Sequence, residues 1–110
     1  MYRIHKRLEI IAAHRLDLNY ESKCSHIHGH NWMIDVYMQS EELDENGMVC
    51  DFTLIKQRVK DRLDHRFLNE VLDVNPTAEN IAKWIADQLG EKCYLVRVKE
   101  SEGNTAEYER

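Results

Sequence analysis

The sequence predicts an α+β fold in which an antiparallel sheet carries two helices on one face. Three observations support this: apolar residues alternate near the N-terminus, recur at helical spacing in the middle of the chain, and alternate again near its end. Alternation predicts half-buried strands, and recurrence every three or four residues predicts amphipathic helices. The chain has 110 residues without an internal repeat or linker, so residues 1–110 are expected to form a single domain.

The first half of the chain is expected to hold three strands. Tyr2 to Ala13 begins with alternating apolar and polar residues, which predicts a strand, whereas residues 14–29 are polar and irregular and predict a loop. Asn31 to Gln39 is expected to be a second strand with one apolar face. The acidic region Ser40 to Gly47 ends in Asn-Gly, a strong hairpin signal, so Met48 to Asp51 is predicted to be a short third strand.

Two helices are expected next. Apolar residues recur at helical spacing after Phe52, with Thr53 as a candidate cap, and residues 64–76 are irregular. Thr77 is expected to cap a second helix, with Glu79 in its first turn and Gly90 at its C-terminal end.

The chain is expected to end in two strands. Cys93 to Ser101 alternates, with Tyr94, Val96 and Val98 on one face, and Thr105 to Arg110 follows a Gly-Asn turn as a closing edge strand. A small sheet with one covered face has open edge strands. We therefore expect copies of the chain to join their sheets, for example into a barrel.

Composition excludes several classes of function. Acidic residues outnumber basic ones by 20 to 15, giving a formal charge of −5, which argues against binding nucleic acid. We expect neither a secretory signal nor a membrane span, because the N-terminus alternates and no window approaches the roughly 20 apolar residues that a span needs. Three cysteines without a Cys-x-x-Cys pair fit no disulfide framework, so a reducing cytoplasm is the simplest location.

The most informative segment runs from Cys24 to His30. In an extended backbone, His28 and His30 point the same way, and Gly29 between them lets the backbone bend. His14, at the end of the first strand, lies beside this pair if the two strands are neighbours. Three imidazoles with a fourth position open are typical of catalytic Zn²⁺. By spacing alone, His5 and His26 remain alternative ligands.

Four further residues are candidates for chemistry. Cys24 has polar neighbours, so beside a metal its thiol would have a lowered pKa and could act as a base. Asp64 could orient His65 for proton transfer, although by sequence alone a capping Asp next to an exposed His is the favoured explanation. Glu100 continues an apolar strand face, where its carboxylate is either solvated beyond the strand or paired with a ligand that has two N–H donors.

Six motifs occur in one order along nearly the whole chain: Ala12-Ala13-His14, Cys24-x-x-x-His28-Gly29-His30, Val49-Cys50-Asp51-Phe52, Leu63-Asp64-His65-x-x-Leu68-Asn69, Asn75-Pro76-Thr77-Ala78-Glu79-Asn80 and Val98-Lys99-Glu100-Ser101. In these motifs the chain resembles the 6-pyruvoyltetrahydropterin synthase family, and within it the bacterial 6-carboxytetrahydropterin synthases.

The resemblance implies a fold and a set of site residues. The fold would be the tunnelling fold, whose subunits form barrels as trimers or hexamers, with active sites between subunits. The zinc ligands would be His14, His28 and His30. Cys24, Asp64 and His65 would be catalytic, and Glu100 would bind the amino-pyrimidine edge of the pterin.

The resemblance also implies a reaction. The substrate would be 7,8-dihydroneopterin triphosphate, and the carboxy-forming branch would release acetaldehyde and triphosphate on the route to queuosine and other 7-deazapurines. The short spacing between Cys24 and His28 resembles this branch, and Ile27 argues against a branch that adds a glutamate there. Two alternatives remain: triphosphate elimination alone, which gives 6-pyruvoyltetrahydropterin, and a zinc- or pterin-binding module without turnover. The resemblance assigns no residues to the triphosphate; Lys23 and Arg66 are named as candidates for that contact without a motif to support them.

Overall fold

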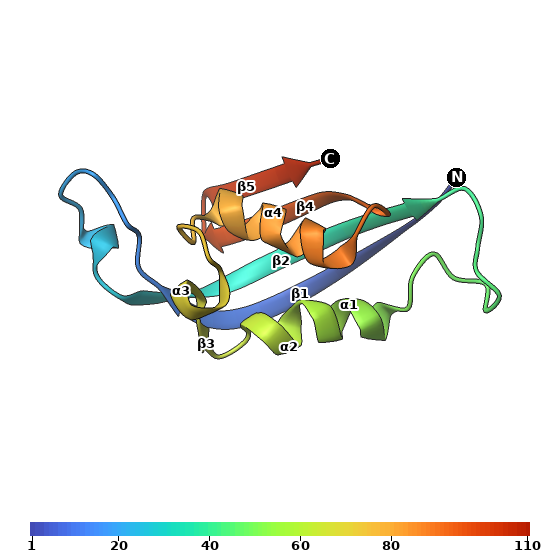
Figure 1. The fold of residues 1–110 in the computed structure, drawn as a ribbon, viewed down its shortest axis with the longest axis horizontal. Coiled ribbons are helices and arrows are strands. Elements are labelled where there is room, and N and C mark those ends of the chain that lie inside the picture. The colour runs from blue at the N-terminus through green and yellow to red at the C-terminus, as the bar shows by residue number, and fades with distance from the viewer.

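The computed structural model describes all 110 residues as a curved sheet with its helices on one face (Figure 1). The strand order is β3-β1-β2-β4-β5. The strands are β1 (Tyr2–His14), β2 (His28–Ser40), β3 (Arg66–Phe67), β4 (Cys93–Ser101) and β5 (Asn104–Glu109). The predicted α+β class is confirmed, although β3 pairs in parallel with β1, so the sheet is mixed.

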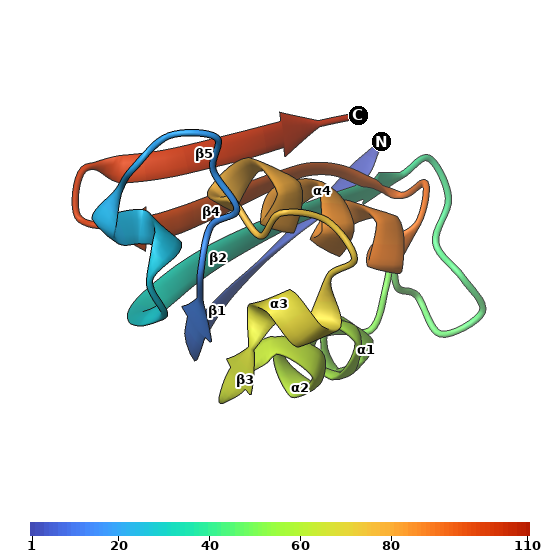
Figure 2. The same ribbon diagram turned by 60° about the vertical axis from the view of Figure 1, so that its left-hand side comes forward.

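Four α-helices and one short 3-10 helix complete the chain: α1 (Phe52–Arg58), α2 (Lys60–Leu63), α3 (Leu68–Val71), α4 (Ala78–Leu89) and η1 (Lys23–Ser25). Figure 2 shows all four α-helices on the same side of the sheet. The core between the two layers is apolar and includes Ile10, Trp32 and Ile34 from the strands and Ile55 and Ile85 from the helices. Burial of this face is the main stabilising contribution.

The antiparallel pair β1 and β2 fixes which residues share a face. Its register runs without a break from Tyr2 opposite Ser40 to His14 opposite His28. Residues that face each other across the pair point to the same side of the sheet. The predicted second strand is therefore confirmed but begins earlier, at His28, because its pairing continues to the end of β1.

Several local predictions are wrong. Met48 to Asp51 forms bends and no strand, and Asp51 instead caps α1 by accepting a hydrogen bond from the N–H of Thr53 (2.8 Å). The supposedly irregular residues 64–76 contain β3 and α3. At the start of β4 a bulge shifts the register, so Cys93 takes the buried place that Tyr94 was expected to fill.

Other local predictions are confirmed. Thr77 caps α4 by accepting a hydrogen bond from the N–H of Asn80 (3.1 Å), and Gly90 ends that helix with a positive φ of 86°. The two C-terminal strands form as expected.

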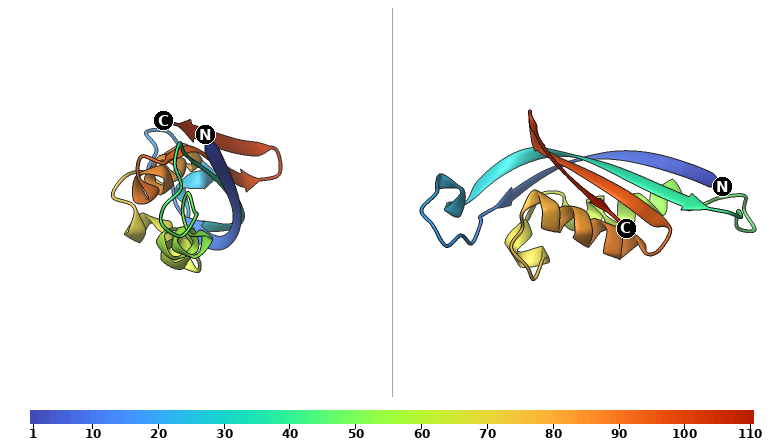
Figure 3. Two further views of the ribbon diagram at one scale, coloured as in Figure 1. Left: turned by 90° about the vertical axis from the view of Figure 1, so that its right-hand side faces the viewer. Right: turned by 90° about the horizontal axis from the view of Figure 1, so that it is seen from above.

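The ends of the sheet are open. Figure 3 shows the sheet arching over the helices, with the loop after β1 projecting at one end. The strand β3 covers β1 only at Ala12 and Ala13, so the rest of that edge and the outer edge of β5 have no partner within the chain. None of the helices is long and apolar enough to cross a membrane.

Candidate metal centre

Three histidines lie close together where β1 ends and β2 begins, on either side of the connecting loop. His14 lies opposite His28 in the strand register, and His30 lies opposite Ala12, one step further along the same face. Their rings lie 4.6 to 5.3 Å apart between centroids, and one ligand atom from each lies within 4.8 Å of the others. His14 is fully buried, and His28 and His30 are half-buried. The structure therefore brings together the three histidines that the sequence selected and leaves out His5 and His26.

Hydrogen bonds to carbonyl oxygens fix two of the rings. The Nδ1 of His14 lies 2.8 Å from the carbonyl of Pro76, and the Nδ1 of His28 lies 2.8 Å from the carbonyl of His26. A carbonyl only accepts hydrogen bonds, so each Nδ1 carries the proton and each neutral ring presents an Nε2 lone pair. The buried Nε2 atoms of His14 and His30 have no hydrogen-bond partner.

The environment keeps the buried rings neutral. Burial lowers the pKa of His14, with the Pro76 carbonyl opposing part of the effect, and burial likewise lowers the pKa of His30. Neutral imidazole is the form that binds a metal. The three side chains could therefore hold a metal ion. Tetrahedral Zn²⁺ requires nitrogens about 3.4 Å apart, so the rings would have to shift inward to bind it.

Trp32 forms one wall of the centre, which the sequence did not reveal. It is completely buried, its indole N–H donates a hydrogen bond to the carbonyl of Ala12 (3.1 Å), and its ring meets His14 and His30 edge-on at 4.9 and 5.1 Å. The available signal was its position two residues after His30, on the same face of the strand. Trp32 therefore restricts the orientation of both imidazoles.

Asparagines hold the chain that leaves His14. The side chain of Asn69 bonds both the N–H and the carbonyl of Arg15 (2.9 and 2.8 Å), and Asn75 bonds both groups of Asp17 (2.8 and 3.0 Å). Asn80 in turn donates to the carbonyl of Asn75 (2.9 Å). These hydrogen bonds fix the backbone at the start of the loop that carries Cys24. This role of the asparagines was not predicted from the sequence.

Glu100 extends toward the histidines from the end of β4. Its two carboxylate oxygens lie 3.8 Å from the Nε2 of His14 and 3.8 Å from the Nε2 of His30. The side chain is 27% exposed and also lines a pocket of about 460 Å³ beside residues 16–20, the start of α4 and the β4–β5 turn. Glu100 is thus neither a solvated residue beyond the strand nor an isolated buried charge.

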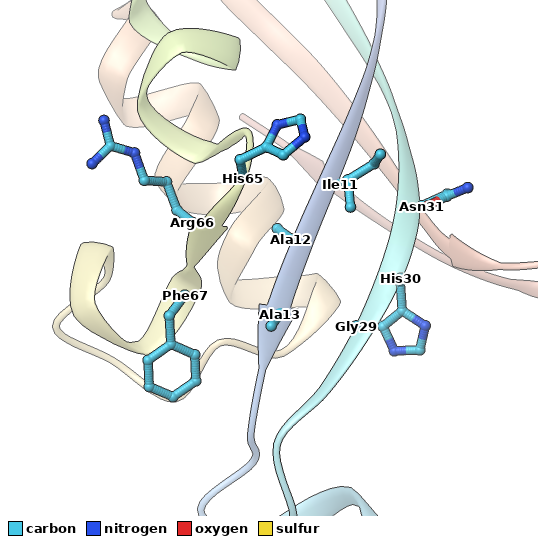
Figure 4. A pocket seen from close by; sticks show the side chains of 9 residues that line it. All are labelled: Ile11, Ala12, Ala13, Gly29, His30, Asn31, His65, Arg66 and Phe67. Atoms are coloured by element: carbon cyan, nitrogen blue, oxygen red, sulfur yellow. The ribbon is translucent and has the colours of Figure 1, made fainter.

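Asp64 and His65 lie together but outside this cluster. Asp64 accepts a hydrogen bond from the N–H of Ile11 (2.9 Å), which lowers the pKa of its carboxyl group, and it lies 3.2 Å from the Nδ1 of His65. His65 has a positive φ of 58°, and its side chain is 73% exposed. Both His65 and His30 line a shallow pocket of about 470 Å³, but their rings stand apart within it (Figure 4).

Cys24 lies in η1 with a partly buried side chain. Its carbonyl accepts a hydrogen bond from the N–H of Leu16 (2.9 Å), and its own N–H donates to the hydroxyl of Ser22 (3.1 Å). The thiol is not among the ligand groups within 4.8 Å of one another. Within one chain, the strands therefore position the three histidines and Glu100, and backbone contacts with β1 hold Asp64 and His65. The loop between β1 and β2 positions Cys24.

Comparison with known proteins identifies relatives of the chain. The family profile for 6-pyruvoyl tetrahydropterin synthase matches residues 3–110. The chain is 41% identical to a 6-carboxy-5,6,7,8-tetrahydropterin synthase of Synechocystis sp. over 100 residues, covering 83% of this chain and 77% of the relative. It is 31% identical to that of Bacillus subtilis, covering 86% and 68%. The solved 6-pyruvoyl tetrahydropterin synthase of Caenorhabditis elegans superposes with a TM-score of 0.77 at 26% identity, covering 99% of this chain and 95% of that one.

Proposed function

The chain belongs to the 6-pyruvoyl tetrahydropterin synthase family of lyases, and we propose that it is a zinc-dependent 6-carboxy-5,6,7,8-tetrahydropterin synthase. Its substrate would be 7,8-dihydroneopterin triphosphate, and its products 6-carboxytetrahydropterin, acetaldehyde and triphosphate. One observation carries the proposal: three histidines converge on one point in a chain whose relatives carry the name of this enzyme.

His14, His28 and His30 would hold the Zn²⁺. Their support comes from fixed tautomers, burial and the unpartnered Nε2 atoms of His14 and His30. A bound Zn²⁺ polarises hydroxyl groups and lowers their pKa, which suits a substrate with a hydroxylated side chain. The Pro76 and His26 carbonyls would keep two of the ligands oriented for the ion.

Glu100 would bind the pterin. Its carboxylate lines the pocket beside α4, where it could accept hydrogen bonds from two adjacent N–H groups of the amino-pyrimidine edge. This contact would place the side chain of the substrate toward the histidines. An interaction of this kind satisfies a charge that would otherwise be costly to bury.

Cys24 and His65 would move protons on the two sides of the substrate side chain, with Asp64 orienting His65. The 3.2 Å contact between Asp64 and His65 supports the pairing. Within one chain His65 lies apart from the histidine cluster, and the edges of the sheet lack partners. We therefore expect the active sites to form between subunits of a trimer or hexamer, each subunit being one tunnelling-fold domain over residues 1–110.

The choice of product rests on the cysteine loop. Three residues separate Cys24 from His28, a spacing that resembles the carboxy-forming branch. The relatives from Synechocystis sp. and Bacillus subtilis are named as enzymes that form the carboxy product. The product would enter the queuosine pathway in the cytoplasm, where Cys24, Cys50 and Cys93 would stay reduced. The name of the Caenorhabditis elegans neighbour keeps simple triphosphate elimination as the second candidate.

The test is a single incubation of zinc-loaded protein with 7,8-dihydroneopterin triphosphate, followed by mass analysis. The proposal predicts 6-carboxytetrahydropterin together with acetaldehyde and triphosphate. Triphosphate with 6-pyruvoyltetrahydropterin and no acetaldehyde would instead establish the second candidate. Unchanged substrate after prolonged incubation would leave a binding module as the remaining explanation.

A further inference from the structure

Glu100 is placed to serve the metal as well as the pterin. We propose that, in the substrate-free protein, the Glu100 carboxylate is the fourth ligand of the metal held by His14, His28 and His30, and that the pterin draws it away. This inference rests on the proposed function, since it assumes the metal and the pterin.

The contacts between Glu100 and the histidines are too long to be hydrogen bonds. The two oxygens of Glu100 face the Nε2 atoms of two different histidines, each at 3.8 Å. Such distances exceed those of hydrogen bonds, and the Nε2 of His14 is a lone pair because its Nδ1 donates to Pro76. The carboxylate oxygen of Glu100 and the Nε2 of His14 are both acceptors, so they repel each other unless a cation lies between them. Glu100 thus faces two of the three imidazoles, while its carboxylate lies outside the group of ligand atoms that are within 4.8 Å of one another.

The distances are close to those of a fourth ligand. With zinc–nitrogen and zinc–oxygen bonds of about 2.0 to 2.2 Å, a tetrahedral site separates neighbouring ligand atoms by about 3.4 Å. The observed 3.8 Å separations join a different oxygen of Glu100 to each nitrogen, so ligation requires a rotation that brings one oxygen toward both histidines, which a partly exposed glutamate can supply. A carboxylate also offsets part of the charge of the bound dication.

The backbone of Glu100 suits a residue with two positions. The pairing of β4 with β5 shifts register between Lys99 and Ser101, so Glu100 sits at an irregularity, and bulges commonly re-aim side chains at functional sites. From this point the carboxylate reaches the histidines and also lines the pocket beside α4. One residue would therefore close the metal site at rest and open it when its carboxylate turns to the N–H groups of the pterin.

The test measures metal binding and not turnover. Zinc dissociation constants are determined by chelator competition for the full chain and for Glu100→Gln, with Glu102→Gln as the control, because Glu102 makes the same charge change two residues away on an exposed side chain. We expect the first variant to bind zinc about 10-fold to 100-fold more weakly and the control to match the parent. A third variant, Glu100→Asp, keeps the charge but shortens the side chain, so ligation predicts a similar loss.

The visible spectrum of the Co²⁺-loaded protein distinguishes ligation from simple charge attraction. Without substrate, the bands of Glu100→Gln should differ from those of the parent protein, whereas those of Glu102→Gln should match the parent. If zinc affinity and spectrum are the same in the parent and Glu100→Gln, or if Glu100→Asp retains full affinity, Glu100 is not a ligand. If the parent protein binds no metal at all, the proposed function itself fails, which is a different outcome.

Discussion

Replacing Trp32 by Phe should destabilise the metal-free protein and also weaken its metal site. Trp32 is completely buried, and its indole N–H bonds the carbonyl of Ala12. Losing that hydrogen bond costs about 1 kcal/mol, and the smaller ring leaves a void worth about 1 to 2 kcal/mol more. The total of about 2 to 3 kcal/mol corresponds to a Tm lower by about 10 °C for a domain of this size.

The assay is thermal unfolding in the presence of a chelator, at one protein concentration, together with zinc titration of the folded variants. Trp84→Phe is the matched control, because Trp84 is only partly buried on α4 and lies under Arg62 rather than against the histidines. Trp32→Phe should lose both stability and zinc affinity, since its ring contacts His14 and His30. If both variants bind zinc as tightly as the parent, Trp32 does not orient the ligands and the reasoning is refuted.

Four further predictions concern stability, order and turnover. Burial raises the pKa of Asp35, but hydrogen bonds from an arginine and a histidine outweigh it and leave that pKa below its usual value. Its stabilising contribution is therefore present above its unfolded pKa of about 3.9 and is lost as pH falls through the folded pKa. Asp35→Asn should lower the free energy of unfolding at pH 7 by about 1 to 3 kcal/mol and flatten its decline below pH 4, whereas an unchanged acid profile in denaturant titrations would contradict the assignment. Thr77→Ala removes the cap of α4 and should cost about 1 kcal/mol in urea unfolding, with Thr77→Ser close to the parent. Asn69→Ala releases the backbone of Arg15, so the amides of residues 15–17 should exchange faster with solvent while those of α4 do not change. Cys24→Ala should keep its zinc but lose turnover by about 100-fold or more if the thiol moves a proton, and unchanged turnover would rule that role out.

The fold was predictable wherever one periodicity persists over many residues. The alternation in β1 and β2 and the helical stripe of α4 specify both the elements and their buried faces. Short elements were not predictable, because β3 and α3 depend on packing against β1 and have only two and four residues. Met48 to Asp51 was predicted to be a strand because it follows the Asn46-Gly47 hairpin signal, but Asp51 uses its side chain to cap the helix α1.

Spacing combined with strand pairing predicted a histidine site but left His5 and His26 open, and the family resemblance selected His14, His28 and His30. His28 and His30 share a face by their separation of two, and the unbroken register brings His14 to them. The contributions of Trp32 and Asn75 were not predictable, since each depends on a contact between segments that are distant in the sequence. Glu100 approaches the ring nitrogens from the register shift between Lys99 and Ser101, and no local sequence pattern predicted that shift.

The central claim is that His14, His28 and His30 form a metal centre, and metal stoichiometry tests it most directly. The full chain is stripped with a chelator, reloaded with Zn²⁺, desalted and analysed for metal alongside His28→Ala and a His26→Ala control, since His26 is exposed and outside the cluster. We predict one tightly bound zinc per chain in the parent and in His26→Ala, and none in His28→Ala. Equal metal content in all three proteins, or no zinc in the parent, would contradict the claim.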